Sequence, residues 1–282
     1  MKSIFDMVSA DCSKNTTRKY STSFSLGIYA LDRIYHQPVY GIYGFVRFAD
    51  EIVDSFLGYD QAYLLEKFRK ETVESIESKI SLNPILNSFQ KVVHEYNIEW
   101  ELIDTFLKSM EMDLKKDTVY TAEKYQKYIL GSAEVVGLMC LRVFMKGDSE
   151  KYEQLKPGAM KLGAAFQKVN FLRDVKADYE TLGRSYFPGV NLQQFSLSDK
   201  QEIEAEIESD FNIAFDSIKA LPTGARRGVY IAYIYYKKLF LKIKATPADR
   251  VMNERIRIPN TRKFGLMFKS LMRHQFNALK SY

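Results

Sequence analysis

The chain has 282 residues, 46% hydrophobic content and a net charge of +6, so it carries enough apolar material to bury one large core. No Pro/Gly/Ser-rich linker, low-complexity run or internal repeat divides it, and we expect one domain over residues 1–282. Its two cysteines, Cys12 and Cys140, have a spacing that excludes a thiol-based metal or redox motif.

Apolar residues recur at helical spacing almost throughout, whereas the alternating runs typical of strands are scarce. The sequence therefore predicts an all-α protein. The expected helices cover residues 14–30, 39–57, 60–80, 83–95, 99–115, 121–146, 149–178, 198–219, 223–245 and 264–280. The chain lacks a signal-peptide core, a C-terminal anchor and any apolar run of about 18 residues that could span a bilayer, so we expect a cytoplasmic protein.

Two of these expected helices carry a stripe of polar residues inside an apolar segment. Gln167, Asn170, Asp174 and Asp178 share one helix face, at offsets of 3, 7 and 11 residues. Tyr43, Arg47, Asp50 and Asp54 share another, at offsets of 4, 7 and 11. One such stripe is usually solvated surface. Two Asp-x-x-x-Asp pairs on two largely apolar helices indicate carboxylates that point inward.

Inward carboxylates need a compensating cation, because an ionised group loses several kcal/mol of hydration on burial. Two facing pairs could hold hard divalent ions through oxygen, with Mg²⁺ as the expected ion and Mn²⁺ as the alternative. Magnesium favours a few carboxylates together with phosphate oxygens. Arg47, Arg173 and Arg184 are suited to bidentate phosphate contact, so the implied ligand is a diphosphate.

These residues resemble the signatures of the squalene and phytoene synthase family, most closely its bacterial carotenoid-pathway members. The second signature matches from Leu162 to Pro188, and the first aspartate motif matches from Tyr43 to Asp54. The segment Ser21-Thr22-Ser23-Phe24 is similar to the family's diphosphate-contacting segment. The mid-chain signature, Tyr128 to Met139, departs at Ile129 and Glu134, where the family usually has small residues. The resemblance spans roughly Ser21 to Lys263.

The resemblance implies an isoprenoid synthase-type helical bundle with a central cavity. It assigns the metal to Asp50, Asp54, Asn170, Asp174 and Asp178, with Tyr43 and Arg47 also catalytic. It assigns substrate contacts to Ser21, Ser23, Phe24, Arg47, Tyr128, Gln167, Asn170, Arg173, Arg184, Tyr186, Tyr236 and Arg255. For the last tyrosine position, Tyr230, Tyr233 and Tyr235 are rivals of Tyr236. Because the Tyr128 to Met139 helix departs most from the signature, we expect its residues to tune chain length, and substitutions of Ile129 and Glu134 by smaller residues would test this.

The implied activity is head-to-head condensation of two geranylgeranyl diphosphates to phytoene, through a cyclopropyl diphosphate and without NADPH. A C30 synthase that uses farnesyl diphosphate is the alternative. An alternative of another class is a catalytically inactive membrane-associated scaffold, which the intact aspartate pairs argue against.

Charge is unevenly distributed along the chain. Residues 226–282 hold 14 Lys+Arg against 2 Asp+Glu, a surplus of +12, and residues 1–225 carry −6. A basic segment interleaved with aromatic residues is typical of an anionic membrane surface or of a solvated helix face, and both interpretations stay open. A peripheral contact at the inner face of the cytoplasmic membrane would involve Lys237, Lys238, Lys242 and Lys244. No nucleic-acid-binding module is apparent, and the oligomeric state is left open.

Overall fold

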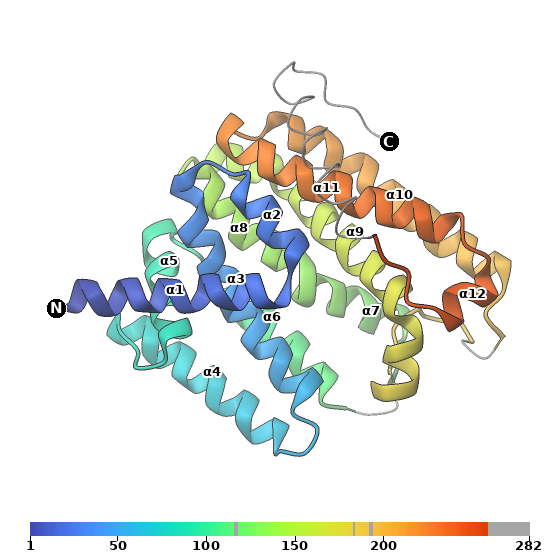
Figure 1. Ribbon diagram of the computed structural model, residues 1–282, viewed down its shortest axis with the longest axis horizontal. Helices are drawn as coiled ribbons and strands as arrows, with labels where there is room; N and C mark the ends of the chain where they lie inside the picture. Colours follow the sequence, from blue (N-terminus) through green and yellow to red (C-terminus); the bar gives the residue numbers. More distant parts are fainter. Residues whose placement is uncertain (116–117, 183, 192–193, 259–282) are drawn as a thin grey trace.

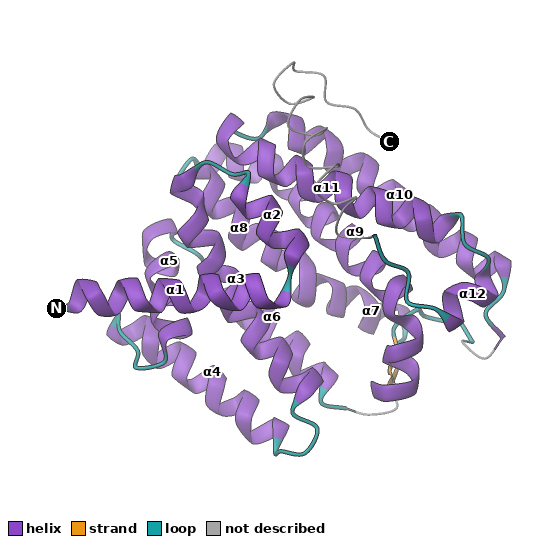
Figure 2. Ribbon diagram, viewed as in Figure 1, coloured by secondary structure: helices purple, strands orange, loops and turns teal. Residues whose placement is uncertain are grey.

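The computed structural model describes residues 1–115, 118–182, 184–191 and 194–258, and these residues form a bundle of helices (Figures 1 and 2). The predicted all-α class is confirmed. The helices are α1 (Lys2–Tyr20), α2 (Thr22–Tyr29), α3 (Arg33–Ser55), α4 (Gln61–Ser78), α5 (Pro84–Tyr96), α6 (Trp100–Asp113), α7 (Ala122–Ile129), α8 (Val135–Met145), α9 (Ser149–Leu182), α10 (Leu197–Ala220), α11 (Thr223–Lys244) and α12 (Ala248–Asn253).

The N-terminal helix differs from its prediction, which ran unbroken over residues 14–30. The chain instead forms α1 and α2, which are separated at Ser21, where the backbone is extended at φ −144° and ψ 105°. The Ser21 hydroxyl accepts a hydrogen bond from the Phe24 amide at 3.2 Å and so caps the N-terminus of α2. Serine favours a cap because its side chain replaces a backbone partner that the first helical turn lacks. The helix predicted over 264–280 lies outside the described residues.

The helix predicted over 121–146 is continuous but irregular. A π-helical turn, η1 (Leu130–Glu134), separates α7 from α8. Residues 122–145 are long and apolar enough to cross a membrane, which corrects the expectation that no such run exists. However, 61% of the apolar window is buried inside the protein, as in the core helix of a globular fold. Two glycines permit close packing between this segment and α9. A Cβ at Gly137 would lie 2.7 Å from the Ala159 carbonyl oxygen, and a Cβ at Gly163 would lie 2.5 Å from that of Ala133.

Two short features escaped the sequence patterns. The strands β1 (Thr118–Val119) and β2 (Arg184–Ser185) pair in parallel, with Thr118 opposite Arg184. Two residues per strand are too few to produce a readable alternation. Helix α12 has only six residues, which is below two turns and gives no amphipathic pattern.

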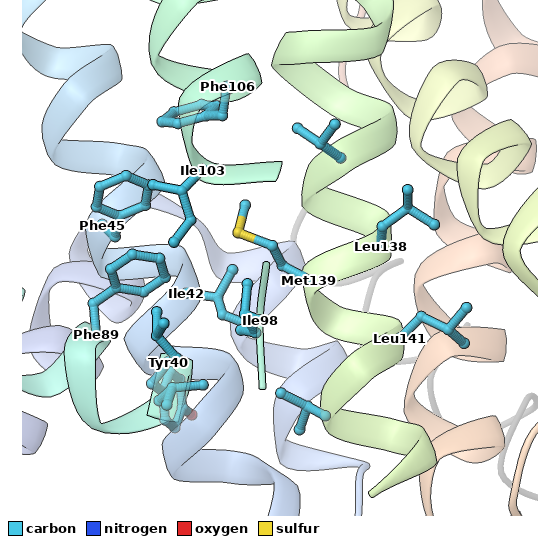
Figure 3. Close-up of a cluster of buried hydrophobic side chains, with 14 of the residues drawn as sticks. Tyr40, Ile42, Phe45, Phe89, Ile98, Ile103, Phe106, Leu138, Met139 and Leu141 are labelled. Carbon is cyan, nitrogen blue, oxygen red and sulfur yellow. The ribbon is translucent and has the colours of Figure 1, made fainter. Parts of the chain in front are cut away.

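Apolar side chains gather in two clusters that flank the site. The first cluster is formed mainly by α3, α5, α6 and α8, and it includes the stacked pair Phe45 and Phe89, with ring centroids 4.0 Å apart (Figure 3). The second is formed mainly by α9, α10 and α11. Helix α9 lies centrally and packs against both α8 and α10 (Figure 1). Helix α9 contributes side chains to the second cluster and packs against α8 of the first, so it lies between the two clusters.

Candidate active site

A cavity of about 950 Å³ lies between the two apolar clusters. One end holds charged side chains, among them Arg47, Asp50, Arg173 and Arg255. Its walls and other end are almost wholly apolar, with lining residues from α2, α3, α8, α9 and α11. Most of the predicted site residues line this cavity: Ser21, Ser23, Phe24, Tyr43, Arg47, Asp50, Tyr128, Gln167, Asn170, Arg173, Tyr236 and Arg255.

The first aspartate motif lies on the cavity side of α3. Arg47 donates to Asp50 at 2.5 Å and to Glu51, and its guanidinium lies 4.4 Å from the ring centroid of Tyr20. Burial and the neighbouring Asp54 charge raise the pKa of Asp50 to about 7, despite the attraction of Arg47. The side chain of Asp50 lines the cavity, so the predicted inward orientation is confirmed for this residue.

The second aspartate motif lies on α9, opposite the first. Arg173 donates to Asp174 through Nε at 3.1 Å. Burial, together with the charges of Asp174 and Asp54, raises the pKa of Asp178 to about 7. Because Asp54 belongs to the first motif, its influence on Asp178 indicates that the two motifs face each other. The helical spacing predicted which residues share a face, and the fold brings the two faces together.

A third carboxylate, which the sequence patterns missed, lies beside these motifs. Asp113 ends α6, is 6% exposed, and accepts hydrogen bonds from the hydroxyls of Tyr128 at 2.6 Å and Tyr186 at 3.3 Å. Burial raises its pKa to about 7. The sequence did indicate that Asp113 is buried, because it lies at helical spacing from Phe106 and Met110 on the same apolar face.

Arg184 links this third carboxylate to the first motif. Its guanidinium donates to Asp54 at 2.7 Å, to the Val53 carbonyl at 3.1 Å and to the Asp113 carbonyl at 2.9 Å. Arg184 is only 5% exposed and does not line the cavity. The direct substrate contact expected of Arg184 stays a prediction, and in this structure the guanidinium donates to protein acceptors behind the cavity wall. It is a positioning residue for Asp54.

Tyr186 also lies behind the cavity wall. Its ring stacks on Phe171, with centroids 4.0 Å apart, and it is 6% exposed. The substrate contact expected of Tyr186 stays a prediction, and in this structure its hydroxyl donates to Asp113. Tyr128 lines the cavity, and its hydroxyl also donates a hydrogen bond to Asp113.

Aromatic rings form the cavity wall next to the charged end. Phe24 lies 5.6 Å from Tyr43 and 6.1 Å from Tyr236, measured between ring centroids. Tyr236 stacks on Phe166 at 4.0 Å. The rivals Tyr230 and Tyr233 are fully buried and do not line the cavity, whereas Tyr235 and Tyr236 both do. The choice of Tyr236 is therefore supported, with Tyr235 beside it.

The predicted metal ligands all carry oxygen donors, but the carboxylates of Asp50, Asp54 and Asp174 form ion pairs with arginines. Among the described residues, no three His, Cys, Asp or Glu side chains lie close enough to hold an ion as they stand. The donor set nevertheless fits a hard divalent ion. The Asn170 Oδ1 atom is buried without a hydrogen-bond partner, and Asp178 faces other carboxylates. Mg²⁺ or Mn²⁺ would satisfy both, provided that the arginines move.

Two sequence expectations about particular side chains need correction. Ile129 is 1% exposed within the second cluster, and Glu134 faces Lys161 and Lys168. Neither lines the cavity, so neither can touch a prenyl chain directly. On this helix the cavity-lining residues are Tyr128, Ser132, Ala133, Val136, Gly137, Cys140, Leu141 and Phe144.

The lysines expected at a membrane surface are not all available to it. Lys237 is 0% exposed and lies 3.6 Å from Glu208, and burial lowers its pKa. Lys244 pairs with Glu208 at 2.7 Å, and Lys242 donates to the Arg257 carbonyl at 2.7 Å. These contacts hold α11 to α10 and to the segment after α12, so the surplus of basic residues is partly structural.

Comparison with known proteins shows the family to which this chain belongs. The family described as Squalene/phytoene synthase matches residues 17–262. Phytoene synthase from Arthrospira platensis is 23% identical over 89% of this chain and 88% of its own length. 4,4'-Diapophytoene synthase from Staphylococcus haemolyticus is 28% identical over 68% of this chain and 67% of its own. A crystal structure of a dehydrosqualene synthase superposes with a TM-score of 0.82 at 19% identity, over 96% of this chain and 98% of that one.

The family match and the curated relatives, together with the helical bundle, define a prenyltransferase that acts on prenyl diphosphates. The chain belongs to the squalene/phytoene synthase family, whose members join two prenyl groups head to head.

Proposed function

We propose that this protein condenses two molecules of geranylgeranyl diphosphate to phytoene, by way of a cyclopropyl diphosphate, in carotenoid biosynthesis. The observation that carries the proposal is the shape of the cavity. It is charged at one end and apolar elsewhere, and its volume of about 950 Å³ is near the top of the usual range for small-molecule sites. Such a volume supports the larger of the two candidate substrates.

The charged end would bind the diphosphates. Arg47, Arg173 and Arg255 line it and can donate to phosphate oxygens. Asp50, Asp54, Asn170, Asp174 and Asp178 would hold Mg²⁺ or Mn²⁺. The bound ions would supply the positive charge that stabilises a departing diphosphate.

The remaining chemistry would take place against the aromatic wall. Loss of the first diphosphate leaves an allylic cation, which alkylates the double bond of the second substrate and loses a proton to give the cyclopropyl ring. Loss of the second diphosphate, rearrangement and a further proton loss give the C40 triene, so no NADPH is required. The ring faces of Phe24, Tyr43 and Tyr236 can stabilise the cations, and the apolar walls exclude water.

Condensation of farnesyl diphosphate to a C30 product is the second candidate, and the Staphylococcus haemolyticus relative favours it. The deciding experiment incubates the purified protein with Mg²⁺ and either diphosphate, with and without NADPH, and identifies the hydrocarbon. Phytoene from the C20 substrate alone supports the proposal. A C30 hydrocarbon as the main product would replace it, and no product from either would favour an inactive scaffold.

Chain length should depend on the apolar end of the cavity. Leu155 lies there, 18 residues or about 27 Å of helix from Arg173 along α9, and is 4% exposed. Leu155→Phe should lower kcat/KM for the C20 substrate, relative to the C15 substrate, by about 10-fold or more. Competition assays with both diphosphates measure this ratio.

Ile129→Val is the matched control, since Ile129 is buried but lines no part of the cavity. An unchanged substrate ratio in Leu155→Phe, or an equal change in Ile129→Val, would mean that chain length is set elsewhere.

We further propose that the enzyme docks on the inner face of the cytoplasmic membrane, because a C40 hydrocarbon is far more soluble in a bilayer than in water. Each Lys or Arg near an anionic surface contributes about 1 kcal/mol. Sedimentation with anionic vesicles should therefore fall at high salt. It should also fall when five basic residues of the C-terminal segment are changed to Gln: Arg262, Lys263, Lys269, Arg273 and Lys280.

The matched control removes five exposed lysines elsewhere: Lys67, Lys70, Lys124, Lys127 and Lys151. Co-sedimentation that is negligible under all conditions, or that both variants lose equally, would argue against a docking role for the C-terminal segment.

A further inference from the structure

Three carboxylates of the two aspartate motifs, those of Asp50, Asp54 and Asp174, are partnered by arginines. Arg47 pairs with Asp50, Arg184 pairs with Asp54, and two arginines share Asp174. Arg255 is one of these two, with its Nε atom 2.6 Å from Oδ1 of Asp174. A divalent ion cannot approach these oxygens without repelling the guanidinium groups beside them. Ligand binding must therefore rearrange at least some of the pairs.

The four arginines differ in how firmly they are held. Arg184 is buried and has several protein acceptors. Arg47 and Arg173 come from the same helices as their partners, which keeps them close. Arg255 comes from the segment after α12, and its side chain is 51% exposed. Water screens an exposed ion pair, so the contact of Arg255 is the easiest of the four to break.

The backbone that carries Arg255 is anchored independently of that contact. Ile256 and Ile258, on either side of Arg257, are 6% and 8% exposed and belong to the second apolar cluster. The Arg255 guanidinium can therefore leave Asp174 while its backbone stays in place. Because Arg255 also lines the cavity, the phosphate-binding end lies within reach of the same side chain.

We infer that Arg255 neutralises Asp174 in the empty site and moves to a diphosphate oxygen when a divalent ion takes its place on that carboxylate. This inference rests on the proposed diphosphate substrate. It assigns Arg255 two opposite effects. Without diphosphate it competes with the metal for Asp174, and with diphosphate it supports the same metal by binding the phosphate.

The test measures binding to the purified full-length chain, with Arg255→Gln as the variant. Titration with Mn²⁺ alone, followed by electron paramagnetic resonance, should give a Kd about 2- to 5-fold lower than in the wild type, because the competitor is gone. Calorimetric titration with inorganic pyrophosphate at saturating Mg²⁺ should give a Kd about 10-fold higher, because a charge-assisted contact is lost. Arg255→Lys keeps the charge and should restore the wild-type Mn²⁺ affinity, but only part of the pyrophosphate affinity.

Two controls separate contact from general electrostatics. Arg257→Gln removes the same charge two residues away, on the same cavity, and should tighten Mn²⁺ binding less than Arg255→Gln. Arg250→Gln removes an arginine of α12 that pairs with Glu254, and should change neither constant.

The inference is overturned if Arg255→Gln leaves the Mn²⁺ affinity unchanged or lowers it, or if Arg257→Gln raises that affinity equally. It is also overturned if pyrophosphate binds Arg255→Gln as tightly as the wild type. These readouts do not depend on turnover. A wild-type chain that binds both ligands as expected but condenses neither prenyl diphosphate would refute the proposed function and leave the inference standing.

Discussion

Asp50→Asn and Asp174→Asn should each reduce turnover of the prenyl diphosphate by at least about 100-fold, because each removes a charged oxygen from the proposed metal site. The fold should survive. Burial and neighbouring carboxylates raise the pKa of Asp50 from 3.8 to about 7, so this carboxyl destabilises the fold increasingly as the pH rises between these values and fully above them, and a neutral Asn avoids that cost. Steady-state assays and thermal unfolding at pH 8 measure the two effects.

Asp216→Asn is the control for charge removal as such. Asp216 lies on α10, and its side chain is 78% exposed beside Lys219. Its turnover should match the wild type. Near-normal turnover in a well-folded Asp50→Asn or Asp174→Asn variant would refute the assignment of the metal site.

Arg184→Met should lower the free energy of unfolding by about 3 kcal/mol or more, because it leaves Asp113 buried without its cationic partner. Methionine fills similar space with no donors. The loss should also release Asp54, whose carboxylate Arg184 holds at 2.7 Å, and so reduce turnover. Urea denaturation followed by circular dichroism measures the stability change.

A double variant tests whether the buried charge is the cause. Adding Asp113→Asn to Arg184→Met removes the uncompensated carboxylate and should recover part of the lost stability. The stability loss of the double variant should therefore be smaller than the sum of the losses of the two single variants. Arg250→Met, which breaks only the exposed pair with Glu254, should cost less than about 1 kcal/mol. A small loss in Arg184→Met, or strictly additive losses in the double variant, would mean that the network does not stabilise the fold.

The local sequence pattern was sufficient to predict most helices and the residues that make up each polar stripe. A period of 3.6 residues decides which side chains share a face, so Asp50 and Asp54, and likewise Asp174 and Asp178, could be grouped from the sequence. It was insufficient where a single residue interrupts a helix without changing the apolar period. Ser21 separates α1 from α2, and the π-helical turn at Leu130–Glu134 rotates the faces of the helix that carries it.

The sequence by itself determined the helical class, the two aspartate motifs and the family signatures, because these depend on residue type and short-range spacing. Only the tertiary structure decided what those side chains contact. Arg184 reaches Asp54 across 130 residues and the Asp113 carbonyl across 71. Lys237 is buried although its sequence context is basic. Periodicity decides which residues share a face of one helix, but the packing of distant helices decides what each face contacts. The partners of the arginines, the burial of Asp113 and the residues that line the cavity all depend on that packing.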